Sequence, residues 1–578
     1  MNSLPQEKLD RLYKALEPLN RQYDPIVGML RVPLRSSGLL KFFQGFPVHP
    51  TRESLGYAAA LLDTGDPKLY QRAVKIIQQI LRLQDQKPAS KTYGVWPKYL
   101  EEKPFKIVQP DQNWCNFLGS LMLQVALNHR DHLPSPLMAE IDRAILHAAR
   151  SIQRRNVPLE YTNIAIMGIY VKLITAQTYK VTDLHDYAMA RLRDFHFHTL
   201  DQGGFSEYNS PTYTIITLKV LGRLRLHIEN IEAKKLIERL YRLAWQEISH
   251  HFQPSTLQWA GPHSRSYSTL LEADVLALIE RSTSECVNWG IAETHPAIDE
   301  HWLLLPCPQD LEPFFLSSNE PRTVSQTLFK KIPKQVLTTY ITPTFSLGTV
   351  NYSDFWHQRR PLVAYWGSSK EPNYLQLRCL HNGVDFAAAQ FFSVQSEGQV
   401  LAGVSFSKDI NPINPYIQSK TDDSRILTKD LRLRFEFSGL FDTDRVKVQI
   451  PSLIDSKSSV HLHLDNLHFQ ILIPYAQFDQ TIARWEIHQS TSCLYLDLVL
   501  WSGKQRMFRL AELEQAAIGI ALQITPEAIS VPDVLINVHD HWLDMDWKHL
   551  SLRLLNRPAD QLTLNTSCLL YTSPSPRD

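Results

Sequence analysis

The sequence predicts a multidomain protein of α and β class, in which an N-terminal (α/α) toroid of helical hairpins is followed by an antiparallel β-sandwich domain. Three observations lead to this fold class. The chain has 578 residues, which exceeds the size of one ordinary hydrophobic core. From about residue 50 to 281, apolar residues recur with a period of about 3.6, as in amphipathic helices. Beyond about residue 335 the period becomes two, as in half-buried strands.

The composition is that of a globular protein without a strongly charged partner. Apolar residues make up 44%, charged residues 21%, and the formal net charge is +1. A basic excess is usual in nucleic-acid-binding chains, so no nucleic-acid partner is predicted. An apolar run of about 18 residues is lacking, so no membrane partner is predicted. The 6 cysteines have no CxxC spacing, which indicates free thiols; no metal and no cofactor are expected.

The two ends of the sequence are set apart from the domains. Residues 1–50 are interpreted as a lead-in segment that starts with a polar amphipathic helix pattern. This start lacks the charged-then-apolar layout of a secretory signal, so we expect a cytoplasmic protein, or a periplasmic or secreted one if residues precede Met1. CLLYTSPSPRD, residues 568–578, resembles a translated sequencing adapter and is expected to be a non-native tail.

Residues 51–320 are predicted to form the helical domain. Runs rich in apolar and small residues alternate with runs that carry more charge. A buried helix alternating with a half-exposed one predicts two concentric layers, as in a toroid or a solenoid. Long loops precede the buried helices, and such loops often carry a site on a rigid scaffold. The apolar runs begin near residues 113, 160, 211 and 265, and the charged runs near 69, 137, 182 and 234.

Residues 335–566 are predicted to form the β-sandwich. Stretches such as VLTTYITPTFSLGTV, RLRFEFSG and AIGIALQIT are alternating and rich in β-branched or aromatic residues. Short strands at close spacing are typical of a large antiparallel sandwich. The join to the helical domain is expected between residues 300 and 335, where the sequence is proline-rich and unpatterned.

Four polar residues stand at one spacing in the helical half. Asn113, Asn163, Tyr213 and His263 follow one another at intervals of 50 positions. Each opens, or lies just before, an apolar helical run. A helix–turn–helix repeat of that length brings all four to the same end of the molecule. Polar residues gathered at one rim of a helical repeat domain make a candidate active site.

A toroid followed by an antiparallel β-domain resembles the heparinase II/III-like and alginate-lyase group of polysaccharide lyases. The resemblance covers roughly residues 50 to 560 in architecture and only short stretches in motif. FSEYNSPTYT is similar to a family segment in which an acidic residue precedes Ser-Pro-x-Tyr, and LHNGVDF to a His-x-x-x-Asp motif of the β-domain. The matching residues are Ser210, Pro211, Thr212, Tyr213, His381, Asp385 and Asn163, whereas Thr214, Gly383 and Ile164 stand where the family usually has His.

The resemblance implies cleavage of a uronic-acid-containing polysaccharide by β-elimination, with an acidic polysaccharide or oligosaccharide as partner. Such a lyase neutralises the uronate carboxylate and removes the neighbouring C5 proton. We assign Tyr213 as base or acid, and Asn163 as carboxylate ligand with Asn113 in reserve. His381 is assigned as a second base or carboxylate partner. His263 and Arg265 are assigned as charge-stabilising or positioning groups that lower the pKa of the tyrosine.

Further candidates for substrate binding lie beside these residues. Trp114, Tyr208 and Trp259 can stack on sugar faces, and Asn209 and Glu207 are additional polar candidates. Each of the polar assignments has a structural alternative. Asn113 and Asn163 can be helix N-caps, Tyr213 a core aromatic residue, and Glu207 a helix-cap carboxylate.

Two other functions stay open at this point. Helical toroids also carry glycoside hydrolases, which use two carboxylates that flank the scissile bond. Asp111, Glu160, Asp201 and Glu207 lie near the same predicted rim and can supply such a pair. A catalytically degenerate carbohydrate-binding protein is the third interpretation, because His is replaced at positions 164 and 214.

Overall fold

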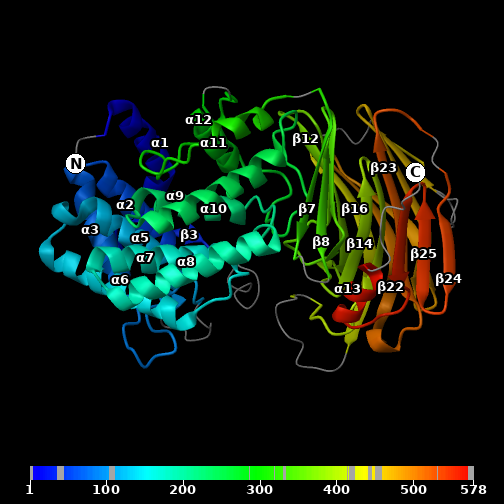
Figure 1. The fold of residues 1–578 in the computed structure, drawn as a ribbon, viewed down its shortest axis with the longest axis horizontal. Coiled ribbons are helices and arrows are strands. Elements are labelled where there is room, and N and C mark those ends of the chain that lie inside the picture. The colour runs from blue at the N-terminus through cyan, green and yellow to red at the C-terminus, as the bar shows by residue number, and fades with distance from the viewer. Residues whose placement is uncertain are drawn as a thin grey trace. The chain divides into compact units, whose positions relative to one another are not determined.

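The fold was analysed in a computed structural model (Figure 1), in which the chain divides into two compact units. Unit 1 comprises residues 1–200, 215–245 and 273–309, and unit 2 comprises residues 201–214, 246–272 and 310–578. Two segments from the predicted helical domain, 201–214 and 246–272, therefore group with the β-domain. The structure describes residues 4–34, 45–102, 111–284, 287–317, 319–329, 333–412, 414, 424–439, 446–449, 459–529 and 532–569.

Helices make up most of the first half of the chain, as predicted. A short two-stranded pairing, β5 (Phe252–Gln253) with β6 (Gln258–Trp259), follows the last long helix. No helix within the described residues is long and apolar enough to cross a membrane. The helices are α1 (Gln6–Gln22), α2 (Thr51–Asp63), α3 (Pro67–Leu81), α5 (Trp114–His129), α6 (Ser135–Arg155), α7 (Thr162–Tyr179), α8 (Thr182–Gln202), α9 (Tyr213–His227), α10 (Ile231–His250), α11 (Ala273–Ser282) and α12 (Ile291–Thr294).

Burial divides the helices into the two predicted layers. Helix α7 is buried all around from Thr162 to Ala176, whereas α3 is buried along a single stripe. The inner helices α2, α5 and α7 pack side by side, and α3 and α6 pack against them from outside. A helix that is apolar all around needs neighbours on every side, and the amphipathic outer helices supply them. The predicted hairpin toroid is confirmed.

Local sequence signals set several helix ends. The Asp66 carboxylate accepts a hydrogen bond from the Lys68 amide at 2.8 Å, and Pro67 occupies the first turn of α3, where its missing N–H costs nothing. Asn156, in the left-handed conformation, ends α6. The fourth predicted apolar run differs from the others. It begins near residue 265, but α11 begins only at Ala273, so His263 and Arg265 lie in a loop.

Unit 2 is an antiparallel β-sandwich, as predicted. One sheet of 8 strands has the order β10-β14-β15-β23-β19-β18-β17, with β20 beside β19, and a sheet of 9 strands has the order β21-β22-β16-β12-β11-β9-β8-β7, with β13 beside β12. A third sheet contains β24, β25 and β26. The strands are β7 (Arg322–Leu328), β8 (Gln335–Ile341), β9 (Phe345–Val350), β10 (Tyr352–Asp354), β11 (Leu362–Gly367), β12 (Pro372–His381), β13 (Val384–Asp385), β14 (Ala389–Ser396), β15 (Gln399–Phe406), β16 (Arg425–Gly439), β17 (Lys447–Gln449), β18 (Ser459–Leu464), β19 (Leu467–Phe478), β20 (Thr481–Ile482), β21 (Arg484–Gln489), β22 (Cys493–Arg509), β23 (Ala516–Thr525), β24 (Leu535–His539), β25 (Trp542–Trp547) and β26 (Leu550–Leu555).

The main core of unit 2 lies between its two large sheets. Along β16, Leu433, Phe435 and Phe437 are fully buried and pack in this core. Because successive side chains of a strand point to opposite faces, Arg432, Arg434 and Glu436 lie on the other face of the same sheet. The strands β14, β15 and β23 are buried on both faces, since the small third sheet and α13 (Gln561–Leu569) cover their outer side. The sequences of these strands are therefore continuous apolar runs without alternation.

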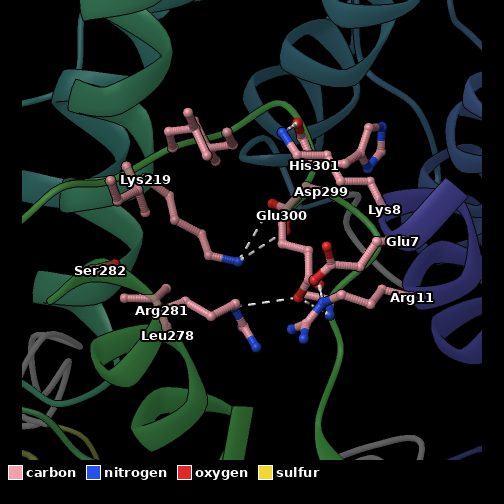
Figure 2. A pocket seen from close by; sticks show the side chains of 14 residues that line it. Glu7, Lys8, Arg11, Lys219, Leu278, Arg281, Ser282, Asp299, Glu300 and His301 are labelled. Atoms are coloured by element: carbon pink, nitrogen blue, oxygen red, sulfur yellow. Dashed lines mark hydrogen bonds and ion pairs between the residues drawn. The ribbon is translucent and has the colours of Figure 1, made fainter. Parts of the chain in front are cut away.

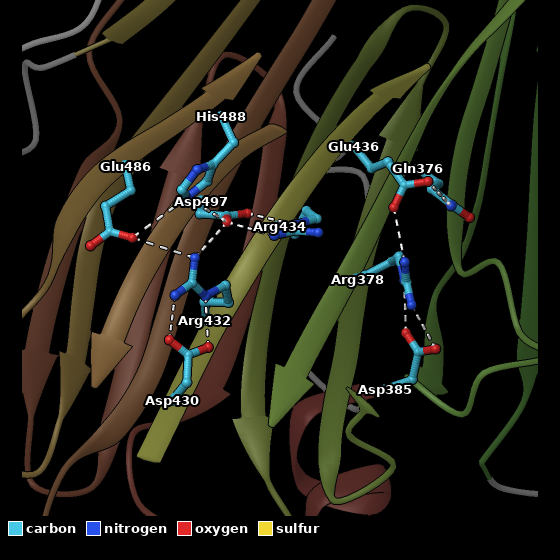
Figure 3. A network of polar contacts seen from close by, with 10 residues as sticks. All are labelled: Gln376, Arg378, Asp385, Asp430, Arg432, Arg434, Glu436, Glu486, His488 and Asp497. Carbon is cyan, nitrogen blue, oxygen red and sulfur yellow. Dashed lines mark hydrogen bonds and ion pairs between the residues drawn. The ribbon is translucent and has the colours of Figure 1, made fainter. Parts of the chain in front are cut away.

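The outer face of the 9-stranded sheet carries an ionic network (Figure 3). Asp497 on β22 is fully buried and accepts hydrogen bonds from Arg432 and Arg434 at 2.7 and 2.8 Å. On β12, Arg378 donates to Asp385 at 2.8 Å and to Glu436 at 2.9 Å. Burial raises the pKa of Asp497 and its two arginines lower it, with a net lowering. The carboxylate is therefore ionised and paired.

The predicted non-native tail falls mostly outside the described residues. Cys568 and Leu569 are the last residues of α13, and residues 570–578 lie outside the described part of the chain. Cys568 is buried in the core beneath the third sheet.

Candidate functional site

Tyr213 is held at the first turn of α9 by the loop that precedes it. The Ser210 hydroxyl accepts a hydrogen bond from the Tyr213 amide at 3.0 Å and donates to the Arg265 carbonyl at 2.6 Å. The short hydroxyl side chain thus joins the helix start to a second loop of unit 2. This bond fixes Tyr213 beside Arg265, although 52 positions separate them in the sequence.

Arg265 organises the polar groups around Tyr213. Its guanidinium donates to the Tyr213 hydroxyl at 2.9 Å, to Glu207 at 2.6 Å and to the Gln358 side-chain oxygen at 3.0 Å. The same guanidinium lies 4.1 Å from the centre of the Tyr213 ring, which adds a cation–π attraction. The Arg265 and Glu207 side chains are only 13% and 7% exposed, so their charges depend on each other.

The environment of Tyr213 keeps its proton in place. Burial, the largest effect, raises the pKa of the phenol, and Arg265 lowers it. Tyr267, whose hydroxyl lies 2.7 Å from that of Tyr213, and the charge of Glu207 raise the pKa further. The net result is a pKa above the usual value near 10 for tyrosine. A phenol in this state is a proton donor, which fits the acid role among the two predicted for Tyr213.

A buried carboxyl group that the sequence reasoning missed supports the loop. Glu247 on α10 accepts hydrogen bonds from the Asn209 amide at 2.7 Å and from the Thr214 hydroxyl at 2.9 Å. Burial raises the pKa of Glu247 to about 7. Thr214, which stands where the resembling family has His, therefore has a structural partner inside unit 2. No motif in the sequence indicated this contact, which joins residues 33 positions apart.

His263, Asn209 and Trp259 form a buried cluster behind the site. His263 Nδ1 lies 2.8 Å from the Asn209 carbonyl, and its Nε2 lies 3.3 Å from the Tyr365 hydroxyl. The Asn209 side chain donates to the carbonyls of Ala260 and Pro262 and accepts from the Trp259 indole. Burial lowers the pKa of His263 to about 3, so the imidazole is neutral. These contacts favour a positioning role for all three residues.

Tyr208 is also interior. Its side chain packs in a small cluster with Leu328, Leu337 and Val350, which lie on or beside the strands of the 9-stranded sheet. Trp259 is 1% exposed and Tyr208 is 5% exposed. Neither ring offers a face to a sugar in this conformation. The predicted sugar stacking of these two residues stays a prediction that requires movement of the loops.

Three predicted site residues belong to unit 1. The Asn113 side chain accepts from Arg155 at 2.7 Å and donates to the Tyr161 hydroxyl at 3.1 Å, and it makes no capping bond although it precedes α5. The Trp114 indole donates to the Thr51 hydroxyl at 3.1 Å. Asn163 is the second residue of α7 and is buried. Their proposed roles stay predictions.

His381 ends strand β12 of unit 2. Its Nε2 lies 3.0 Å from the Thr428 hydroxyl, and its ring is 5.2 Å from that of Phe386. No hydrogen bond joins His381 to Tyr213 among the residues that the structure describes. The pKa of His381 is lowered, chiefly by burial. The acid of the same motif, Asp385, is paired with Arg378.

The structure adds a histidine that the sequence analysis did not select. His357 follows β10 in the run FWHQRR and is exposed, next to Gln358, which binds Arg265. Burial of part of the ring lowers its pKa, Asp385 raises it, and Arg360 and Arg265 lower it, with a net lowering. His357 Nε2 lies 3.4 Å from the side-chain nitrogen of Gln358, whose oxygen binds Arg265, so Gln358 links the two side chains. The polar run His357 to Arg360, directly after Phe355 and Trp356, was the available signal.

Metal-ligating side chains are not clustered in the part of the chain that the structure describes. Among the described residues, no group of three or more His, Cys, Asp or Glu side chains is arranged to hold a metal ion. Tyr267, whose hydroxyl contacts that of Tyr213, is 60% exposed, and His357, beside Gln358, is exposed as well. The arrangement joins a phenol proton donor to a guanidinium, and Gln358 links that guanidinium to the imidazole of His357.

Comparison with known proteins gives remote similarities. A protein-family model, described as a domain of unknown function (DUF8769), matches residues 12–296. A crystal structure of heparinase III has 10% sequence identity and a TM-score of 0.44, and the match covers 96% of this chain and 92% of that chain. The crystal structure of heparan sulfate lyase HepC from Pedobacter heparinus has 10% identity and a TM-score of 0.34, covering 87% of this chain and 80% of that chain. No curated protein matches the chain in sequence.

Proposed function

We propose that this chain is a polysaccharide lyase that cleaves a uronic-acid-containing polysaccharide by β-elimination, with Tyr213 as general acid. The observation that carries the proposal is the protonated Tyr213 phenol, which is bound by Arg265 beside the exposed Tyr267, with His357 linked to Arg265 through Gln358. A weakly acidic donor next to a cation suits protonation of a leaving sugar oxygen. Arg265 and Gln358 supply N–H groups that can stabilise the negative charge of the reacting uronate.

The elimination can be written with these groups. The neutral His357 imidazole removes the C5 proton, and the electron pair of that bond forms the C4–C5 double bond. The bond from C4 to the bridging oxygen breaks, and Tyr213 donates its proton to that oxygen. The His357 imidazolium then releases its proton to water, and the Tyr213 phenolate takes up a proton from water, which restores both groups. The product ends are a 4,5-unsaturated uronate and a new reducing end, because the protonated bridging oxygen stays on C1 of the leaving sugar.

Two opposite charges act on the pKa of the Tyr213 phenol: the Arg265 cation lowers it and the Glu207 carboxylate raises it. Glu207 compensates the Arg265 cation at 2.6 Å, so the cation does not strip the phenol of its proton before substrate arrives. A substrate carboxylate that binds beside Arg265 adds a second negative charge and raises the pKa of the phenol again. Both effects keep Tyr213 in the form that an acid requires.

The test is incubation of the protein with alginate, heparin, chondroitin, hyaluronan and glucuronan. A rise in the ultraviolet absorbance of unsaturated uronate, lost in Tyr213→Phe, supports the lyase. New reducing ends without that absorbance indicate the glycoside hydrolase, which the sequence left open. Binding to one of these polysaccharides without either signal indicates the non-catalytic binding protein. Either of the last two outcomes overturns the proposal.

A further inference from the structure

Unit 1 contains a large cavity between its inner helices. It has a volume of about 530 Å³, within the ~300–1,000 Å³ usual for small-molecule sites. Side chains of α2, α5, α7, α9 and α11, and of the segment 295–299, line it. An adjoining cavity of about 300 Å³ shares Lys219, Arg281 and Asp299 with it (Figure 2). None of the lining residues takes part in the Tyr213 site.

Two cations on α9 face this cavity with incomplete pairing. The Lys219 ammonium group lies 3.4 and 3.5 Å from the two Asp299 oxygens, which is long for a charged hydrogen bond. Arg223 lies 3.8 Å from Asp299 and 3.4 Å from the Ser120 hydroxyl. Arg223 Nε is buried and has no hydrogen-bond partner among the described residues. The long contacts of the Lys219 ammonium group and of the Arg223 terminal nitrogens leave both cations able to bind a ligand anion in the cavity.

The rest of the lining contains an apolar wall, a set of acceptors, and the basic side chains of Arg52, Arg281 and His295. Phe117, Leu121, Met167 and Ile216 form the apolar side. Glu53, Asp274 and Asp299 place carboxylates on the polar side. Three carboxylates disfavour a simple aliphatic acid, which has nothing to donate to them. A sugar ring has hydroxyl groups that donate to carboxylates and a C–H face that packs against an aromatic ring such as Phe117.

We propose that this cavity binds a small sugar acid, a mono- or disaccharide with one carboxylate, whose carboxylate lies between Lys219 and Arg223. The ligand carboxylate accepts hydrogen bonds from the Lys219 ammonium group and from the terminal nitrogens of the Arg223 guanidinium. A hydroxyl group of the ligand donates to Asp274. The inference is independent of the proposed lyase activity, because all of its residues belong to unit 1 and it requires no cleavage.

The test is isothermal titration of the full chain with D-glucuronate, with D-glucose and sulfate as comparison ligands. Lys219→Met and Arg223→Gln each remove one carboxylate contact, and each is expected to weaken glucuronate binding about ten- to hundredfold. Arg193→Gln is the matched control, because Arg193 is paired with Glu232 on the exposed surface of α8 and α10. This control is expected to bind glucuronate as the unchanged protein does.

The outcomes separate this inference from the proposed lyase. Glucuronate binding that exceeds glucose and sulfate binding and that is weakened in Lys219→Met supports it, whether or not polysaccharide is cleaved. Absence of glucuronate binding overturns it, as does equal binding by Lys219→Met, which tests the idea even if Arg223→Gln does not fold. If glucose or sulfate binds as tightly as glucuronate, the ligand is not a sugar acid and the proposal is overturned. A failure of the polysaccharide assay, with glucuronate binding intact, refutes only the lyase.

Discussion

Removing Arg265 should destabilise unit 2 far more than removing an exposed arginine. In Arg265→Met the Glu207 carboxylate, whose side chain is 7% exposed, loses its cation at 2.6 Å. Breaking a buried pair from one side costs about 3–5 kcal/mol, because an uncompensated charge stays in the interior. The hydrogen bond to Tyr213 at 2.9 Å is lost as well. We therefore expect the free energy of unfolding of unit 2 to fall by about 3–5 kcal/mol.

The measurement is urea unfolding followed by tryptophan fluorescence, with the transition of unit 2 fitted separately because a two-unit chain need not unfold in one step. Arg484→Met is the control, since Arg484 and Glu486 form a pair on the same sandwich with side chains that are 53% and 30% exposed. It should cost less than about 1 kcal/mol. The double variant Arg265→Met with Glu207→Gln should recover much of the loss. A loss in Arg265→Met as small as that of Arg484→Met refutes the reasoning.

Four other predictions follow from the same contacts. Tyr213→Phe removes the proton donor and should lower kcat about 10²- to 10⁴-fold with the fold retained, as judged by circular dichroism; unchanged turnover contradicts the acid role. Glu247→Gln should remove a pH dependence of stability. The pKa of Glu247 in the folded protein is about 7, above its ordinary 4.5. Its contribution to the free energy of unfolding therefore falls by about 3 kcal/mol as pH rises from about 4.5 to 7. Denaturant titrations at several pH values measure this change, and a flat profile in the unchanged protein contradicts it. His357→Gln should abolish the loss of rate at acidic pH, because this loss is expected where the His357 base becomes protonated, below pH 6.5. If the rate of the variant still falls at acidic pH, another residue is the base. Asp299→Asn removes the internal carboxylate near Lys219 and should tighten glucuronate binding in titration calorimetry; weaker binding shows that Asp299 does not compete with the ligand.

The fold class followed from periodicity because burial acts on single elements. Helix α7 is apolar on all sides and α3 on one stripe, and each pattern can be read without knowing what packs against it. The alternation of Leu433 and Phe435 with Arg432 and Arg434 likewise identifies a strand with two different faces. The strands covered on both sides, such as β23, show no alternation, and only the third sheet explains why.

The candidate site was less predictable, because its contacts join distant parts of the chain. The 50-residue ladder placed Tyr213 at a helix start, where it is, but the same spacing gave His263 an equal rank. His263 is enclosed by Asn209 and Tyr365, a contact across 102 positions that spacing does not encode. The carboxyl of Glu247 and the imidazole of His357 were not selected, since neither stands in a recognisable motif.

The sequence by itself determined the order of the two architectures and the helix start at Tyr213. These depend on local period and turn residues, which each segment expresses alone. Only the tertiary structure decided that Arg265 serves Glu207 and Tyr213 together, that Tyr213 keeps its proton, and that Lys219 and Arg223 line a cavity with unfilled hydrogen bonds. The physical reason is that protonation and pairing are set by burial and by charges within a few ångströms, and these arise only when distant segments pack.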